Sequence, residues 1–491
     1  MSDVVDPHGG HCVLISPYGD VSSLGIRILS SCLKQAGFST TKLFLTLDKE
    51  MGDIPPGLVT YDERLLREIG ELCQGSLLVG ISVMTNYFDR AVQLAAFLRR
   101  EVGVEVVLGG VHASLMPREC AEMADYVCVG ESEEAVVDLA RSLADGRFPS
   151  GIPNVCYKRD GEVVMNPPRP LIQDLDQLPF QDYSLDDDYA VFEGVLTKLD
   201  LRGLEHLMTT GPGRGLAGNR AYYFTMMTRG CPYSCTYCCN RSVRQLYPGQ
   251  NYLRRRSVDN FIGELSWVRK NLGFVNLLVI ADDSFFDASD GEIEEFCRRF
   301  KTEIGIPFFS LGTPFGITEK KLSMMTDAGM VFVQVGIQTG SRRTQKMYKR
   351  PFDNQRMLKI TDLLNRYTDR IRVHYDLILD NPMETDEDIL ETIRMLLMVK
   401  KPYHIQFFSL TLFPGTELAS LAVERGLIED WKSQVYRKQQ FRKGRTYLNF
   451  VISLFNLPVP KWVIRLLISK FSLLTFNRPY FGRVLRLVFR A

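Results

Sequence analysis

The stretch Arg229-Gly-Cys231-Pro-Tyr-Ser-Cys235-Thr-Tyr-Cys238-Cys239-Asn240 carries three cysteines in a C-x₃-C-x₂-C pattern. Cys thiolates are the usual ligands of iron–sulfur clusters. A four-iron cubane held by three thiolates keeps one iron free for an outside ligand, whereas a closed zinc site normally has four protein ligands. We therefore predict that Cys231, Cys235 and Cys238 bind such a cluster. Cys239 is the alternative fourth ligand, but in an extended loop the adjacent position points elsewhere, so it is predicted to be inert or to lie behind the ligands.

Strands and helices alternate around this cysteine loop. Short β-branched or aromatic runs predict six strands, and amphipathic segments predict helices between them. The pattern indicates a six-unit β/α arrangement, either an open barrel or another parallel sheet, with reactive groups at the carboxyl ends of the strands. The predicted strands are Tyr222–Thr228, Asn276–Ala281, Phe308–Gly312, Val331–Ile337, Val373–Leu379 and Ile405–Leu412, and the helices are Val258–Asn271, Glu319–Ala328, Arg356–Tyr367 and Asp386–Val399.

Residues 1–150 show the same alternation and predict a separate α/β domain. Its strands and helices indicate a doubly wound, Rossmann-like parallel sheet, in which ligands lie at the carboxyl ends of the strands. The strands are Cys12–Pro17, Thr41–Leu47, Leu77–Thr85, Glu105–Gly110 and Tyr126–Glu131, and the helices are Leu24–Ala36, Asp89–Arg100 and Glu133–Leu143.

The other parts of the chain are a connection and a basic tail. Residues 151–218 predict a hairpin at Asp160-Gly161, followed from Pro167 by a linker with little regular structure. The second α/β domain is expected over 219–430, and 431–491 are expected to be helical. This tail holds 13 Lys or Arg and no acid, whereas the first 430 residues hold 46 bases and 58 acids.

Composition excludes several classes of protein. With 45% hydrophobic and 24% charged residues, the chain of 491 residues is neither disordered nor a coiled coil. A net charge of +1 predicts no nucleic-acid partner. The polar N-terminus and the 11 scattered cysteines predict a cytoplasmic protein.

The tail has two interpretations. Its predicted helical stripes, Lys461-Arg465-Ser469-Ser472 and Arg483-Arg486-Arg490, lie opposite apolar residues, as in helices that lie on a membrane surface. The first interpretation is peripheral contact with the inner face of the membrane. The second is a helix packed across the barrel, with its arginines facing the acidic body of the protein.

The cysteine loop resembles that of the radical S-adenosylmethionine (SAM) superfamily, whose C-x₃-C-x-aromatic-C pattern is matched by Cys231, Cys235, Tyr237 and Cys238. The resemblance implies a partial barrel, a [4Fe-4S] cluster and SAM, which binds the open iron and is cleaved to a 5′-deoxyadenosyl radical. It further implies that Asp283, Gln338 and Ser341, at strand ends, hold the ribose or amino-acid part of SAM, with the main chain near Tyr237 at the adenine. Many relatives have Glu at position 338, and Gln is also an acceptor. Helix capping is the alternative for Asp283 and the expectation for Thr385 with Asp386.

The first domain resembles the vitamin B12-binding domain that is fused to one branch of this superfamily. The matching segments are Gly80–Met84, Leu108–His112 and Val129–Glu133, and they imply that cobalamin lies against Ser82, Gly109, Gly110, His112, Gly130 and Glu131. The Asp-x-His-x-x-Gly motif of histidine-ligated cobalamin is missing, because residues 16–23 contain no histidine. The identity of the cobalt ligand therefore stays open. For His112, the alternative to contact with cobalamin is a hydrogen bond within its own turn.

Together these features predict a cobalamin-dependent radical SAM enzyme. The favoured reaction is methylation of an unactivated carbon in a small molecule, with a flavodoxin- or ferredoxin-like electron donor. The tail leads to the hypothesis that this molecule is a lipid, an isoprenoid or another hydrophobic compound. The alternatives are a radical cyclase, rearrangement or oxidation enzyme, a tRNA methylthiotransferase-like enzyme, and a corrinoid sensor or carrier. No catalytic acid or base is assigned; His374, Tyr375 and Tyr403 are candidates for the barrel mouth.

Overall fold

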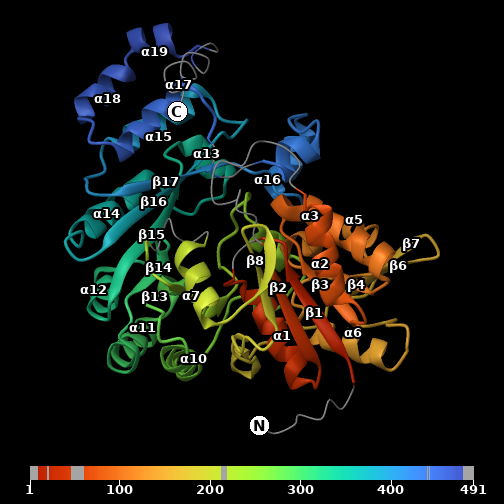
Figure 1. The fold of residues 1–491 in the computed structure, drawn as a ribbon. Coiled ribbons are helices and arrows are strands. Elements are labelled where there is room, and N and C mark those ends of the chain that lie inside the picture. Colours follow the sequence, from red (N-terminus) through yellow and green to blue (C-terminus); the bar gives the residue numbers. More distant parts are fainter. Residues whose placement is uncertain are drawn as a thin grey trace.

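The computed structural model describes residues 9–18, 21–45, 60–211, 218–438, 441, 443–478 and 481. Two large sheets organise this part of the chain, and Figure 1 shows them side by side, the N-terminal one in red to yellow and the second in green to blue. A two-stranded ribbon, β11 (Thr228–Arg229) with β12 (Arg254–Arg255), lies between the cysteine loop and the N-terminal domain.

The front sheet has nine strands in the order β7-β6-β5-β4-β3-β1-β2-β8-β9, and the six from β5 to β8 are parallel. Helices cover both faces: the α1 and α6 side chains pack on one, and those of α2 and α3 on the other. The predicted doubly wound sheet is therefore confirmed. Its strands are β1 (His11–Ser16), β2 (Ser39–Phe44), β3 (Leu78–Ser82), β4 (Val106–Gly109), β5 (Tyr126–Cys128), β6 (Val155–Arg159), β7 (Glu162–Met165), β8 (Asp188–Phe192) and β9 (Val195–Lys198).

The described part of residues 1–150 contains six α-helices, α1 (Leu24–Gln35), α2 (Glu63–Cys73), α3 (Phe88–Phe97), α4 (Val111–Leu115), α5 (Pro117–Ala121) and α6 (Glu133–Ala144). Of these, α1, α3 and α6 match the three predicted helices, whereas α2, α4 and α5 were not predicted. The predicted hairpin is also present, as the antiparallel pair β6–β7, with positive φ at Asp160 and Gly161.

The expectation of little regular structure after Pro167 is wrong. This segment contains β8, β9 and α7 (Leu201–Thr210), and β8 extends the front sheet by pairing with β2. Its Asp and polar residues look like a linker in the sequence because their partners lie far away. Asp188 and Asp182 form a buried ionic cluster with Lys42 and Arg27, in which Arg27 Nη1 lies 3.3 Å from Asp188 Oδ2.

The second sheet has six parallel strands in the order β10-β13-β14-β15-β16-β17, as expected for an open partial barrel. All six predicted strands are present. They are β10 (Tyr222–Thr225), β13 (Leu277–Ile280), β14 (Phe308–Gly312), β15 (Met330–Gln338), β16 (Arg372–Leu379) and β17 (His404–Ser409), and the helices are α9 (Cys239–Arg244), α10 (Val258–Asn271), α11 (Asp290–Arg299), α12 (Glu319–Asp327), α13 (Arg342–Met347), α14 (Asn354–Asn365), α15 (Asp386–Leu396) and α16 (Glu417–Glu424).

The described part of the tail forms α17 (Tyr447–Ser453), α18 (Lys461–Leu467) and α19 (Lys470–Phe476). The side chain of Asn456 bonds both the amide and the carbonyl of Ile405, at 2.7 and 2.8 Å, and so satisfies backbone groups on the edge strand β17. The expected stripe from Lys461 to Ser472 is not one helix, because α18 ends at Leu467 and Ser469 caps the start of α19. The second stripe, Arg483-Arg486-Arg490, lies outside the described residues. None of the helices in the described residues is both long and apolar enough to cross a membrane.

Removal of the Asp188 carboxylate tests the buried ionic cluster. We expect Asp188→Ala to lower the free energy of unfolding by about 3–5 kcal/mol, because Lys42 and Arg27 would then be buried with too little negative charge. Asp186→Ala is the control, since Asp186 is 73% exposed and its ion pair with Lys34 contributes little. Urea unfolding measures both, and equal losses for the two variants would contradict the role of the buried cluster.

Candidate cofactor sites at the cysteine loop and the front cavity

The cysteine loop follows β10 and β11 and ends where α9 begins at Cys239. Its backbone is fixed at Thr236, whose amide donates to the Tyr348 carbonyl at 3.2 Å and whose carbonyl accepts from Leu418 at 2.9 Å. Cys235 is buried, and Cys231 and Cys238 are half-buried. The loop is therefore attached to α13 and α16 at its centre, and Cys231 and Cys238 are less deeply buried than Cys235.

The chemistry of these thiols suits metal binding. Burial raises the pKa of Cys231 to about 12, so that the thiolate needs a metal cation beside it to form at neutral pH. A hydrogen bond with Cys239 is the main cause of the raised pKa of Cys238. In the described residues, no three His, Cys, Asp or Glu side chains are grouped to hold one metal ion. In a cubane the three thiolates bind three different irons, so they need not converge on one metal ion. Cys231, Cys235 and Cys238 therefore fit such a cluster.

Arg350 is a residue of this site that the sequence analysis missed. Its Nη1 lies 3.8 Å from Cys235 Sγ and donates to Tyr237 Oη at 3.1 Å, and its Nη2 donates to the Gly336 carbonyl at 2.6 Å. The guanidinium thus connects a predicted cluster ligand with the middle of the barrel sheet. No local motif marks Arg350, because it lies more than 100 residues from the cysteine loop.

The strand-end residues occupy different environments. Asp283 is exposed beside the loop and accepts from Asn240 Nδ2 at 2.8 Å, so helix capping does not explain it. Gln338 has a φ of +67°, and its Oε1 is buried without a hydrogen-bond partner. This orphaned acceptor fits a hydroxyl or amino donor of SAM. Ser341 instead caps α13 and donates to Asp388 Oδ1 at 2.6 Å, which accounts for its hydroxyl without a ligand. Thr385 caps α15, as expected.

All three candidates for the barrel mouth lie away from the carboxyl ends of the strands that form it. Tyr375 is buried among the helices outside the sheet, and Tyr403 packs against it with ring centroids 5.6 Å apart. His374 alternates with Tyr375 and lies near the start of β16, beside Phe332 and His404, where burial lowers its pKa to about 4. Strand alternation places Asp376, not Tyr375, on the same face as His374.

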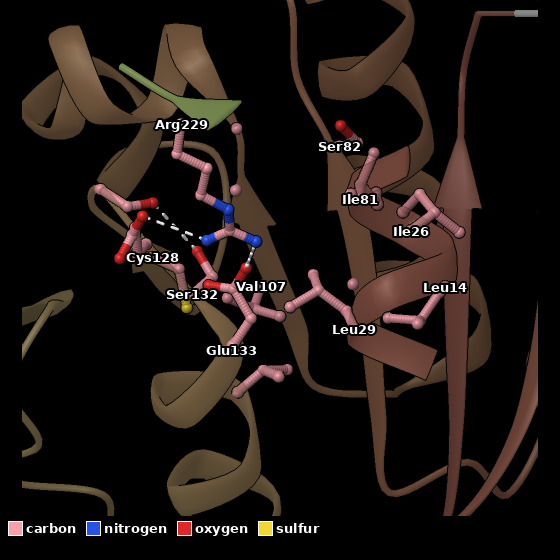
Figure 2. Close-up of a pocket in the computed structure, with 17 residues that line it drawn as sticks. Leu14, Ile26, Leu29, Ile81, Ser82, Val107, Cys128, Ser132, Glu133 and Arg229 are labelled. Carbon is pink, nitrogen blue, oxygen red and sulfur yellow. Dashed lines mark hydrogen bonds and ion pairs between the residues drawn. The ribbon is translucent and has the colours of Figure 1, made fainter. Parts of the chain in front are cut away.

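The front domain contains a cavity of about 240 Å³ at the carboxyl ends of its strands. Ile26 and Leu29 lie on one side of it and Cys128, Ser132, Glu133 and Arg229 on the other (Figure 2). Five of the predicted cobalamin contacts line it, namely Ser82, Gly109, Gly110, Gly130 and Glu131. A cavity of this size fits the slender nucleotide arm of cobalamin. That these five residues contact the cofactor stays a prediction.

His112 does not line this cavity. Its Nδ1 lies 3.1 Å from Thr85 Oγ1, its Nε2 lies 3.7 Å from Glu119 Oε2, and the ring packs against Phe88 and Tyr436. These ring contacts reach Thr85 and Glu119 and do not include the expected hydrogen bond within the turn of His112. Through Tyr436 they attach this turn to the tail.

Gly130 permits a close contact between the two domains. A Cβ atom at this position would lie 1.8 Å from Tyr247 Oη, and the residue has a φ of +78°. Tyr247 Oη also accepts from the Glu131 amide at 3.0 Å. Only glycine allows this tyrosine, which follows α9, to reach the end of β5.

An ionic network continues this contact into the cavity wall. Arg229 pairs with Glu131 at 3.1 Å and Glu133 at 2.5 Å, and Arg254, its partner across the β11–β12 ribbon, pairs with Glu131 at 2.7 Å. Burial alone would raise the pKa of Glu131, but the hydrogen bonds and positive charges of Arg254 and Arg229 hold it below its usual value. Arg229 lies two residues before Cys231, so one side chain links the cavity to the cysteine loop.

Comparison with known proteins identifies both domains. The model of the radical SAM superfamily matches residues 225–396, and that of the B12 binding domain matches residues 10–140. An uncharacterized methyltransferase of Pyrococcus horikoshii is 27% identical over 72% of this chain and 70% of its own length. An anaerobic magnesium-protoporphyrin IX monomethyl ester cyclase of Synechocystis is 23% identical over 88% of this chain and 80% of its own. The structure of OxsB, a cobalamin-dependent SAM radical enzyme with aqua-cobalamin and SAM bound, covers 98% of this chain and 75% of that one with a TM-score of 0.65 at 15% identity.

The fold and the two sites define a radical SAM enzyme with a B12-binding domain. The chain belongs to the cobalamin-binding radical SAM enzymes, whose cofactors are a [4Fe-4S] cluster, SAM and cobalamin. The front-domain cysteines fit this assignment: Cys12, Cys73, Cys120 and Cys128 are buried in the cores, and burial raises the pKa of the last three to about 12.

Gly130→Ala tests the close contact with Tyr247. We expect the variant to lose about 3 kcal/mol of stability, since alanine is strained at this φ and overlaps Tyr247 Oη. Gly146→Ala is the matched control, because Gly146 also has a positive φ but no atom within 4 Å of the added Cβ. Urea unfolding of both variants separates the overlap from the backbone strain, and equal losses would contradict the contact.

Arg229→Gln tests the ionic network. We expect the variant to fold but to bind cobalamin at least tenfold more weakly, because Glu131 and Glu133 lose their shared cation in the cavity wall. Arg169→Gln is the control: Arg169 also pairs with two carboxylates of α6, Glu134 and Asp138, but does not line the cavity. Equilibrium dialysis with hydroxocobalamin measures binding, and unchanged affinity in Arg229→Gln would refute this role.

Proposed function

We propose that this enzyme transfers a methyl group to an unactivated carbon of a small hydrophobic molecule. The observation that carries the proposal is that Arg229 links the two sites: it lines the cavity of the front domain and lies two residues before Cys231 of the cysteine loop. A corrinoid held by this cavity would face the barrel mouth, where the radical forms. When bound, the cluster and SAM supply a 5′-deoxyadenosyl radical, and methylcobalamin supplies the methyl group.

The protein's own residues would bind and orient these groups. Cys231, Cys235 and Cys238 would hold the cluster, while Asp283 and Gln338 offer acceptors to SAM. Arg350 holds the loop at Cys235 against the Gly336 carbonyl. The helices and the tail around the mouth would exclude water from the reacting groups.

The hydrophobic substrate class is supported by the tail and by one relative. Residues 443–449 lie at the end of β16, where Asp380 accepts from the Gly444 amide at 2.8 Å and Asn449 Nδ2 at 2.6 Å. The Phe441 ring packs at a tilt of 47° against Phe408 of β17, with ring centroids 5.4 Å apart, so an aromatic side chain lies beside the mouth. The cyclase relative acts, by its name, on magnesium-protoporphyrin IX monomethyl ester.

A radical cyclase that moves no methyl group is the second candidate. The observation that favours it is the long match to the magnesium-protoporphyrin ester cyclase, which spans 88% of this chain. Both candidates would need an external electron donor of the flavodoxin or ferredoxin type.

Product analysis tests the proposal. After anaerobic reconstitution with SAM and reductant, we expect the chain to form 5′-deoxyadenosine and Cys235→Ala to form none. Cys297→Ala, which removes a buried thiol of α11 far from the loop, is expected to retain it. With substrate, a methyltransferase releases S-adenosylhomocysteine together with 5′-deoxyadenosine; product formed with 5′-deoxyadenosine alone would favour the cyclase, and no 5′-deoxyadenosine at all would favour a sensor or carrier.

A further inference from the structure

The outer faces of α18 and α19 expose large apolar side chains. Trp462, Leu466, Phe471 and Leu474 are 66%, 60%, 77% and 68% exposed. Trp462 and Leu466 lie one turn apart on α18, opposite the buried Ile464, while Phe471 and Leu474 share the outer side of α19, away from the buried Ser472. We call these four residues the apolar face.

The two helices are firmly attached to the barrel by their inner sides. Lys461 Nζ donates to the Val399 carbonyl at 2.8 Å, and Asn477 Nδ2 donates to Asp386 at 2.7 Å. Tyr447 Oη of the neighbouring tail helix α17 donates to the Leu467 carbonyl at 2.8 Å. Figure 1 shows α18 and α19 at the outer edge of the second domain, beside α15 and α17 and away from the front sheet. The apolar face is therefore held outward by a fixed structure.

Positive charge surrounds this face. Arg465 and Lys470 lie on the same two helices, and Arg478 lies two residues beyond α19. All three side chains are exposed, and within the described ranges none of them is within ion-pair distance of a carboxylate. Burial, and then the positive charges of Arg465, Lys401 and Lys400, lower the pKa of Lys461. The expectation that the tail's bases meet the acidic body of the protein is not met at these residues.

We propose that the apolar face docks this enzyme on the surface of an anionic lipid bilayer. Lys and Arg would contact the phosphate head groups, while Trp462 and the neighbouring apolar side chains enter the interface between head groups and acyl chains. A second copy of this chain is a poorer occupant, because pairing of the two faces would bring their unpaired bases together. A nucleic acid would leave the apolar side chains in water. The proposal is independent of the reaction that the enzyme catalyses.

Vesicle sedimentation with the full-length chain tests the proposal. We expect at least tenfold more protein to sediment with phosphatidylglycerol vesicles than with phosphatidylcholine vesicles at low salt. A quadruple variant, Trp462→Ser, Leu466→Ser, Phe471→Ser and Leu474→Ser, should lose at least nine-tenths of this binding, and Arg465→Glu with Lys470→Glu should lose most of it. The matched control is Leu201→Ser with Val423→Ser, which removes exposed apolar side chains elsewhere and should bind like the unaltered chain.

Three outcomes would overturn the proposal. The first is no sedimentation of the unaltered chain with anionic vesicles. The second is binding by the quadruple variant equal to that of the control, with both shown to be folded by circular dichroism. The third is a dimer in light scattering without lipid that the quadruple variant converts to a monomer, since the face would then belong to a second copy. Formation of 5′-deoxyadenosine by the same preparations separates these outcomes from failure of the proposed function.

Discussion

The charged contacts of Arg229 with Glu131 and Glu133 join the two halves of this enzyme. They are partly removed from water and shared with Arg254, so they keep their strength better than ion pairs on the open surface. Arg229 comes from the ribbon beside the cysteine loop, and the two glutamates come from the wall of the front cavity. The relative position of the two cofactor sites therefore depends on this network.

Tight packing at Gly130 supports the same junction. Because residue 130 has no side chain, Tyr247 can hydrogen-bond the amide of Glu131 and so hold the carboxylate close to its arginines. On the far side of the front sheet, the buried cluster around Lys42 and Asp188 attaches β8 to β2. Polar contacts between segments far apart in sequence thus hold the front domain in two places, at the end of β5 and between β2 and β8.

Much of the fold and part of the site could be predicted from sequence because their signals are local. All eleven predicted strands are present, since β-branched runs bounded by glycine and polar residues carry their own pattern. Five of the six expected cobalamin contacts line one cavity, because consecutive parallel strands bring their carboxyl ends to one edge. Arg350, Tyr247 and Arg254 were missed, since a lone arginine or tyrosine has no local signature. The segment after Pro167 was misjudged because its charges are satisfied inside the protein.

The sequence by itself determined the cysteine loop, the two alternating α/β series and the basic character of the tail, because each depends on residues that are neighbours in the chain. Only the tertiary structure decided that Ser341 is a helix cap, that His112 and Tyr375 lie away from the proposed cofactor and substrate regions, and that the tail packs by one side while exposing the other. Those properties depend on which side chains meet across the folded molecule. Burial and long-range hydrogen bonding arise from three-dimensional packing, and local spacing does not specify them.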